Sequence, residues 1–325
     1  MPDDLYPLRF EPILKTVVWG GTALRTFLGA APSSDPTGEA WMLSDQGDNP
    51  SRIANGPLTG TTLRQLLQER QTDVLGSAAT SNGRFPLLLK LLDARENLSV
   101  QVHPNDEQAR RMESASAGLG KTEAWVILRA EPGSRVYAGL REGVTRDDFQ
   151  LALKSGSLPD VLHAYEPRVG DCIFLEAGTV HAIGAGLKLF EVQQTSDITY
   201  RLYDWGRVDA TTKQPRQLHI EQAMACTNYE RGPCDPVTPQ RDSGRERLVA
   251  CRYFTLDRIS ATRPYSVGAP NACRIVVCTG GKGSIVAGDW SEPLRPGSTL
   301  LIPAAVGVCD VIPSEAITML ECGTS

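Results

Sequence analysis

Short segments in which apolar and polar residues alternate recur along this chain, and glycine or proline separates them. Residues 98–103, 172–175 and 187–193 show the alternation most clearly, and 30 glycines and 22 prolines among 325 residues supply turn positions. Alternation with a period of two is the pattern of a strand with one buried face, usually in an antiparallel sheet. We therefore predict that the chain is mainly β.

Three other segments have the hydrophobic period of a helix. Each starts with a side chain that can cap the first turn, and three positions later a second polar residue can return the hydrogen bond. These segments are residues 62–75, 105–112 and 145–154. We expect these few helices to pack outside the sheets.

The length of the chain predicts two domains, because 325 residues exceed the usual size of a single compact domain. Residues 232–246 are rich in proline, glycine and charge and show no periodicity, so we place the junction there. The expected domains are residues 1–232, with the peripheral helices, and residues 245–325.

One internal similarity suggests that the two domains share a hairpin. Residues 168–181 align without gaps on residues 295–308, although chance similarity over such a length is an alternative. The first copy ends on His181 and the second on Val308. If both domains are barrels, only the first one carries a metal-binding side chain at this position.

The composition excludes several classes of function. Lys and Arg total 33 against 38 Asp and Glu, and a net charge of -5 provides no broad basic surface for nucleic acid. Asp3 and Asp4 stand where a secretion signal would be positive, and no run reaches the roughly 18 apolar residues of a membrane span. The eight cysteines form no CxxC pair, which favours reduced thiols. We predict a cytoplasmic protein without nucleic-acid or membrane partners.

Residues 98–103 place a polar stripe on one face of a strand. The polar face carries Ser99, Gln101 and His103, and the apolar face carries Leu98, Val100 and Val102. On an antiparallel sheet such a stripe most often faces water. The stripe alone therefore does not identify a site.

Two of the four histidines, His103 and His181, lie beside turns at the ends of strand-like segments. A third strand places Lys121 and Glu123 on one face. Two imidazoles and a carboxylate are suitable ligands for a divalent metal ion. The pattern indicates a metal site assembled from separate strands.

Two basic residues interrupt apolar strands. Lys90 lies within residues 85–92, where a lysine must be paired, reach the surface or face a wet cavity. Arg201 can form a salt bridge with Glu191 or Asp197, or it can contact an anionic substrate with its fork of donors. Both alternatives for Arg201 remain open at this point.

Several of these segments resemble the signature of the type I phosphomannose isomerases, also called mannose-6-phosphate isomerases. The matching motifs are residues 18–21, 85–92, 98–105, 120–125, 177–183 and 196–205. Together they span most of the first two-thirds of the chain, and its compact length is similar to the short bacterial branch of the family. The last third carries little motif evidence.

The resemblance implies a cupin fold, in which a jelly-roll β-barrel holds one zinc ion and a second cupin-like barrel without metal follows. The implied zinc ligands are Gln101, His103, Glu123 and His181. The implied catalytic residues are Arg201, Lys121, Glu191 and Asp197. The implied substrate-binding residues are Lys90, Ser99 and Trp19.

The implied activity, part of mannose metabolism, interconverts mannose 6-phosphate and fructose 6-phosphate through a cis-enediol intermediate. Zinc would stabilise the negative charge that develops on a sugar oxygen. The proton carrier stays open between Glu191, Asp197 and a water molecule. Two alternatives are a non-haem iron oxygenase, which uses the same two-histidine, one-carboxylate set, and a non-catalytic cupin that binds sugar phosphates. The oligomeric state is not predicted.

Overall fold

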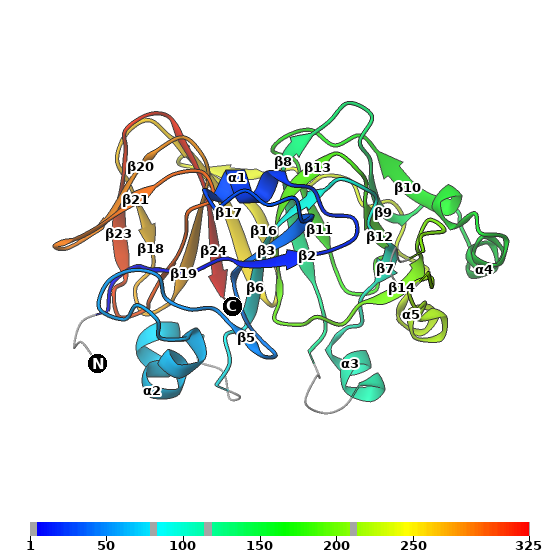
Figure 1. Cartoon of the computed structure of the whole chain (residues 1–325), viewed down its shortest axis with the longest axis horizontal. Helices are drawn as coiled ribbons and strands as arrows, with labels where there is room; N and C mark the ends of the chain where they lie inside the picture. The colour runs from blue at the N-terminus through cyan, green and yellow to red at the C-terminus, as the bar shows by residue number, and fades with distance from the viewer. Residues whose placement is uncertain (1–4, 79–82, 114–118, 209–212, 325) are drawn as a thin grey trace.

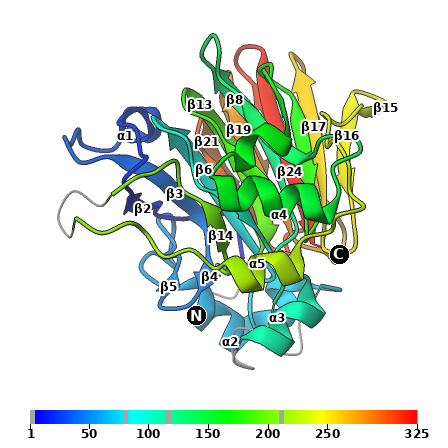
Figure 2. The ribbon, with the colours of Figure 1, turned by 90° about the vertical axis from the view of Figure 1, so that its right-hand side faces the viewer.

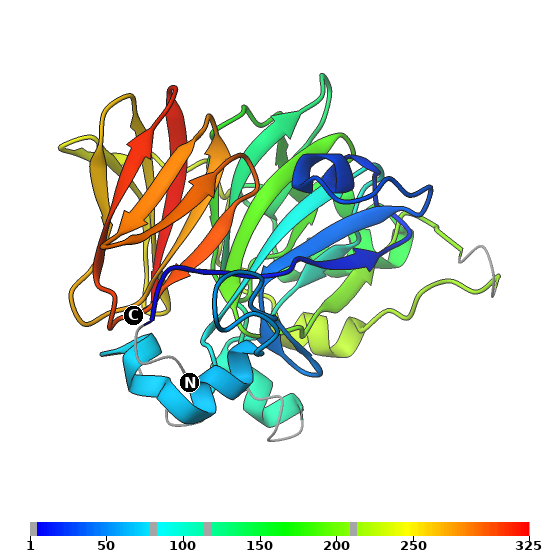
Figure 3. The same ribbon diagram turned by 60° about the vertical axis from the view of Figure 1, so that its left-hand side comes forward.

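The computed structural model describes residues 5–78, 83–113, 119–208 and 213–324, so Asp3 and Asp4 lie outside the described residues. The chain is mainly β, as predicted, with four large antiparallel sheets and one two-stranded ladder. Figures 1 and 3 show two β-rich halves side by side. Among the described residues, no helix has the length and apolar character needed to cross a membrane.

The first half contains two of the sheets. The six-stranded sheet has the order β11-β8-β13-β6-β3-β2 and consists of β2 (Ile13–Thr16), β3 (Thr37–Leu43), β6 (Leu87–Ala94), β8 (Glu123–Ala130), β11 (Cys172–Leu175) and β13 (Leu187–Gln194). The five-stranded sheet has the order β10-β9-β12-β7-β14 and consists of β7 (Val100–Val102), β9 (Val136–Leu140), β10 (Leu162–Tyr165), β12 (His181–Ile183) and β14 (Tyr200–Tyr203). A small ladder joins β4 (Asp45–Gln46) and β5 (Asn49–Pro50).

The second half contains the other two large sheets. The seven-stranded sheet has the order β1-β22-β19-β24-β17-β16-β15 and consists of β1 (Leu8–Arg9), β15 (Gln240–Asp242), β16 (Arg245–Ala250), β17 (Phe254–Ala261), β19 (Arg274–Gly280), β22 (Thr299–Ile302) and β24 (Ile317–Thr324). The four-stranded sheet has the order β18-β23-β20-β21 and consists of β18 (Tyr265–Gly268), β20 (Gly283–Ala287), β21 (Trp290–Leu294) and β23 (Val308–Pro313). Strand β1 joins this half to the start of the chain.

The four large sheets stack as layers. Successive side chains along the strands of the two central sheets point alternately into the two cores on either side. On β6, Leu89 and Leu91 enter the core that the six-stranded sheet shares with the seven-stranded sheet. Leu92, with the opposite orientation, enters the core between the six- and five-stranded sheets. On β19, Val277 packs toward the first half and Val276 toward the four-stranded sheet. Both central sheets are therefore buried on both faces.

The three predicted helices are confirmed together with their caps. They are α2 (Leu63–Leu75), α3 (Asp106–Met112) and α4 (Arg146–Ser155), and each begins with a reciprocal capping box. The helices α1 (Ala23–Leu28) and α5 (Ile220–Cys226) and the short 3₁₀ helix η1 (Leu158–Val161) were not predicted. Helices α4 and α5 lie over the outer face of the five-stranded sheet (Figure 2), where Phe149 and Ala223 join its core.

The hairpin similarity has a structural counterpart. Strand β11 and the start of β12 correspond residue by residue to β22 and the start of β23, and the preceding glycines, Gly170 and Gly297, have φ values of 92° and 89°. His181 is buried, whereas Val308 is 51% exposed. In each half of the described chain, however, the two sheets remain separate ladders, and no closed barrel forms.

Candidate active site

A row of polar side chains crosses the inner face of the five-stranded sheet. Gln101 on β7 is the register partner of both His181 on β12 and Arg201 on β14. The residues on either side of each member belong to the outer core beneath α4 and α5, namely Val100, Val102, Val180, Ala182, Tyr200 and Leu202. Because strands alternate, the three polar side chains face the interior of the first half.

A second row crosses the facing six-stranded sheet. Lys90 on β6 pairs in register with Glu191 on β13 and with Trp41 on β3, and Glu191 pairs with Trp125 on β8. These residues have the orientation opposite to Leu89 and Leu91, so they too point inward. The two sheets therefore place two polar rows around one interior space.

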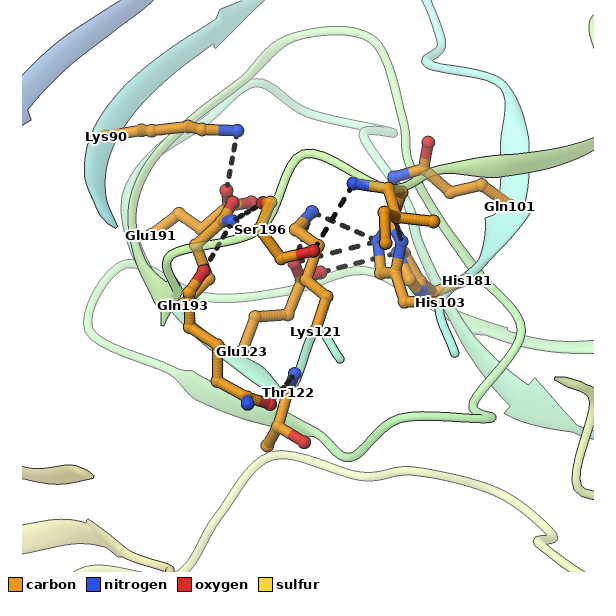
Figure 4. Close-up of polar contacts among 12 residues, drawn as sticks. Lys90, Gln101, His103, Lys121, Thr122, Glu123, His181, Glu191, Gln193 and Ser196 are labelled. Carbon is orange, nitrogen blue, oxygen red and sulfur yellow. Dashed lines mark hydrogen bonds and ion pairs between the residues drawn. The ribbon is translucent and has the colours of Figure 1, made fainter. Parts of the chain in front are cut away.

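His103, Glu123 and His181 form a buried cluster at one side of this space, and their ligand atoms lie within 4.8 Å of one another. Nε2 of His181 lies 3.3 Å from Oε1 of Glu123, and Nε2 of His103 lies 3.8 Å from Oε2. Figure 4 shows the two rings and the carboxylate converging, with Lys121 between them. The separate strands thus bring the three predicted side chains together.

The histidine rings are held in the tautomer that binds metal. Nδ1 of His103 lies 2.8 Å from the carbonyl oxygen of Ile198, and Nδ1 of His181 lies 2.9 Å from that of Thr179. A carbonyl oxygen only accepts, so each Nδ1 donates and each Nε2 keeps a lone pair directed at the cluster. Burial lowers the pKa of both rings, that of His181 to about 4, so both are neutral at pH 7.

Glu123 completes a donor set that fits a divalent cation. Its carboxylate is buried, Oε2 forms an ion pair with Lys121, and Oε1 has no hydrogen-bond partner among the described residues. Burial raises the pKa of Glu123, and Lys121 opposes this shift with its ammonium 2.8 Å from Oε2. A buried carboxylate with so few donors is unfavourable unless a cation compensates it. Two neutral imidazoles and this carboxylate are suitable ligands for a metal ion.

Lys90 is held between two carboxylates on the second row. Its Nζ lies 3.4 Å from Oε1 of Glu191 and 3.7 Å from Oε2 of Glu39. Burial lowers the pKa of Lys90, but the surrounding carboxylates outweigh burial and raise it overall. Burial likewise raises the pKa of Glu191, and Lys90 and Lys121 reverse this to a net lowering. Both partners are therefore charged at neutral pH.

Arg201 is not paired with Glu191 or Asp197 in the way that one sequence hypothesis proposed. Its Nε donates to Oγ of Ser99 at 3.2 Å, and its Nη1 donates to the carbonyl oxygen of Gln217 at 2.9 Å. Arg216 lies on the same pocket and is held by Asp204 through Nε at 2.8 Å. Asp204 also accepts a hydrogen bond from Arg207 at 2.6 Å. Arginines therefore exceed carboxylates at this side of the pocket.

The two rows line a pocket of about 390 Å³. Of the predicted site residues, the pocket is lined by Trp19, Lys90, Ser99, Gln101, Lys121, Glu191, Asp197 and Arg201. His103, Glu123 and His181 adjoin it through Lys121, whose Nζ lies 3.1 Å from Nε2 of His103.

Three features of the pocket differ from the sequence analysis or were missed by it. Leu98 was expected to share a face with Val100, but β7 begins only at Val100, and Leu98 packs in the inner core and lines the pocket. Glu39 was missed, although it interrupts the mainly apolar strand β3 as Lys90 interrupts the apolar run of β6. Arg216 comes from an irregular segment, where no periodic signal points to it.

A mainly β protein with a buried His–Glu–His cluster beside a charged pocket is typical of metal-dependent enzymes that act on small polar molecules. Residues 8–137 match the family model described as phosphomannose isomerase type I, catalytic domain. Mannose-6-phosphate isomerase ManA of Bacillus subtilis is 33% identical over 310 residues, which cover 93% of this chain and 94% of that protein. The mannose-6-phosphate isomerase of Streptococcus mutans is 33% identical over 304 residues, 92% of this chain and 93% of that protein.

The comparison with solved structures points to the same family as these sequence relatives. The crystal structure of the mannose 6-phosphate isomerase from Bacillus subtilis matches with a TM-score of 0.87 and 29% identity, covering 97% of this chain and 99% of that one. The identity and the nearly complete coverage of both chains show that this chain belongs to the mannose-6-phosphate isomerase family.

Proposed function

We propose that this protein interconverts mannose 6-phosphate and fructose 6-phosphate in the cytoplasm. The observation that carries the proposal is the His103–Glu123–His181 cluster beside a charged pocket, in a chain of this family. A cytoplasmic location fits the eight cysteines, none of which forms a disulfide among the described residues.

The proposed metal is zinc, held by His103, Glu123 and His181 with Gln101 as the fourth ligand. Gln101 presents Nε2 to His181 at 3.2 Å, so its amide would have to rotate to offer the oxygen. Bound there, zinc would act as a Lewis acid for the negative charge that develops on a sugar oxygen. The neutral rings and the single carboxylate leave the site a net positive charge of about +1, which favours an anionic intermediate.

The charge of the pocket supports a phosphorylated substrate. Its lining carries the cations Lys90, Lys121, Arg201 and Arg216 and the carboxylates Glu39, Glu191 and Asp197. Arg201 and Arg216 present guanidinium donors that suit a phosphate group, and Ser99 beside Arg201 adds a hydroxyl. Because the whole chain is negative, this local excess would have to attract the substrate.

Proton transfer between C1 and C2 of the sugar, through a cis-enediol, requires a carboxylate within reach of the pocket. Glu191 and Asp197 both line it, and the net lowering of the Glu191 pKa makes Glu191 a weaker base than an ordinary glutamate. We assign catalytic roles to Arg201, Lys121, Glu191 and Asp197, and substrate contacts to Lys90, Ser99 and the buried Trp19. Lys121 would place its ammonium beside the cluster, where it can stabilise developing negative charge.

The proposal extends to the architecture. Each half would be a cupin-type jelly roll of two sheets that do not close, with residues 1–232 as the catalytic domain and 245–325 as the second domain. Among the described residues, the grouping of possible metal ligands lies in the first half.

The test is a coupled assay in which the purified protein converts mannose 6-phosphate, before and after treatment with a chelator, together with metal analysis. We expect isomerisation that the chelator abolishes and added zinc restores. Absence of isomerisation in the zinc-loaded protein would refute the proposed activity. Iron as the bound metal would favour the oxygenase alternative.

A further inference from the structure

The three residues that lead into β8 are fixed by hydrogen bonds outside the regular ladders. The amide of Gly120 donates to Oδ1 of Asp106 at 2.9 Å, and the amide of Lys121 donates to the carbonyl oxygen of Pro104 at 3.0 Å. The amide of Thr122 donates to Oε1 of Gln194 at 2.9 Å. The next residue is Glu123, so these bonds determine where its carboxylate lies.

Gln194 extends the sheet by one step beyond its last regular pair. The ladder between β13 and β8 ends with Gln193 opposite Glu123. The amide of Gln194 then donates to the carbonyl oxygen of Thr122 at 3.2 Å, while its side-chain oxygen accepts from the Thr122 amide. Its Nε2 donates to Oδ1 of Asp106 at 3.0 Å. The buried side chain of Gln194 thereby connects the metal-site strand to the start of α3.

Asp106 receives its remaining hydrogen bond from the second half of the chain. The hydroxyl of Tyr253, in the turn between β16 and β17, donates to Oδ2 of Asp106 at 2.8 Å. Burial raises the pKa of Asp106, but the bonds from Gly120, Gln194 and Tyr253 reverse this to a net lowering. The carboxylate is therefore ionised at neutral pH and accepts from three donors.

We infer that Tyr253 is a positioning residue for the metal site: through Asp106 and Gln194 it fixes the Gly120–Glu123 segment. The second half of the chain thus takes part in holding the metal, through a side chain that touches neither metal nor substrate. The inference rests on the proposed function only in assigning Glu123 as a metal ligand.

The test measures the zinc affinity of the purified full-length chain by competition with a chromophoric chelator, which requires no isomerase activity. Tyr253→Phe removes one hydrogen bond and should weaken zinc binding about fivefold. Asp106→Asn should weaken it by at least as much. The double variant should bind zinc no more weakly than Asp106→Asn, because both changes interrupt one path.

Tyr265→Phe is the matched control. Tyr265 also lies in the second half, and its buried hydroxyl has no hydrogen-bond partner among the described residues. This variant should bind zinc as the unmodified chain does. Unchanged affinity in Tyr253→Phe, or an equal loss in Tyr265→Phe, would overturn the inference.

The two proposals fail separately in this design. A chain that binds zinc and loses affinity on Tyr253→Phe, yet does not convert mannose 6-phosphate, would retain the positioning role and lose the proposed activity. If the chain isomerises the sugar and its Tyr253→Phe variant binds zinc with unchanged affinity, the proposed activity would stand and the positioning role would be lost. A chain that binds no zinc would overturn the positioning role together with the zinc assignment.

Discussion

Replacing Lys90 with methionine tests whether the buried charges of the pocket depend on one another. Lys90 is 5% exposed, and Glu191 and Glu39 lie 3.4 and 3.7 Å from its ammonium. Methionine keeps most of the side-chain volume and removes the charge. The buried Glu191 and the partly exposed Glu39 then each lose their ion pair with this ammonium.

The expected loss of stability follows from that uncompensated charge. Removing one partner of a buried ion pair costs about 3–5 kcal/mol. Glu191 keeps a hydrogen bond from Trp125 Nε1 at 3.0 Å, and Glu39 keeps one from Trp41 Nε1 at 2.8 Å. We therefore expect a loss near the lower limit, about 3 kcal/mol. Adding Glu191→Gln to Lys90→Met should restore about half of the lost unfolding free energy, because the double variant buries one uncompensated charge fewer.

Urea unfolding at pH 7 followed by circular dichroism, with chelator present, measures this loss for the metal-free chain. Lys15→Met is the matched control, because the ammonium of Lys15 lies 4.5 Å from the same Trp41 ring but on a partly exposed strand. The control should lose about 1 kcal/mol or less. Equal losses in Lys90→Met and Lys15→Met, or a double variant less stable than Lys90→Met alone, would refute the reasoning.

Three further predictions concern the metal, the phosphate and pH. His181→Ala should reduce the zinc content of the purified chain several-fold while the far-ultraviolet circular dichroism stays that of a β protein; full zinc content would contradict the ligand assignment. Arg216→Met should raise KM for mannose 6-phosphate about tenfold with unchanged zinc content. Arg231→Met, which removes an arginine paired with Glu176 away from the pocket, should leave KM unchanged, and equal effects would contradict the phosphate contact. Because the folded pKa of Asp106 is lowered, its ionised form stabilises the fold above the unfolded value of about 4, and this contribution disappears as pH falls through the folded pKa. The difference in unfolding free energy between the unmodified chain and Asp106→Asn should be constant from about pH 5 to 7 and shrink below about pH 4, and a constant difference throughout would contradict this assignment.

The parts of the fold that local chemistry determines could be predicted from the sequence. Thr62, Asn105 and Thr145 each cap a helix through bonds that span three residues, so the pattern contains both partners. His103 and His181 were selected because histidine is rare in this chain and both lie beside turns. Their convergence depends on sheet register, which the sequence pattern does not determine.

The rest depends on contacts between distant segments. Arg216 reaches the pocket because Asp204 holds it, and Tyr253 reaches Asp106 because the two halves pack together. Neither residue belongs to a periodic pattern. The separation of each half into two sheets also depends on which strands pair, and strand order cannot be read from the alternation of a single strand.

Because the six-stranded sheet is buried on both faces, a charged residue within one of its apolar strands indicates an internal polar site. The second half covers the outer face of the six-stranded sheet, so neither face of β6 reaches open solvent. A charge in such a strand must therefore meet partners in an internal polar space. The same reasoning applied to β3 would have predicted Glu39 as a pocket residue. Glu39 forms an ion pair with Lys90 on the neighbouring strand β6. In the middle of these strands the charged side chains Lys90, Glu191 and Glu39 therefore point into the pocket, whereas Asp93 and Lys188, which are register partners near the end of β6, have the opposite orientation.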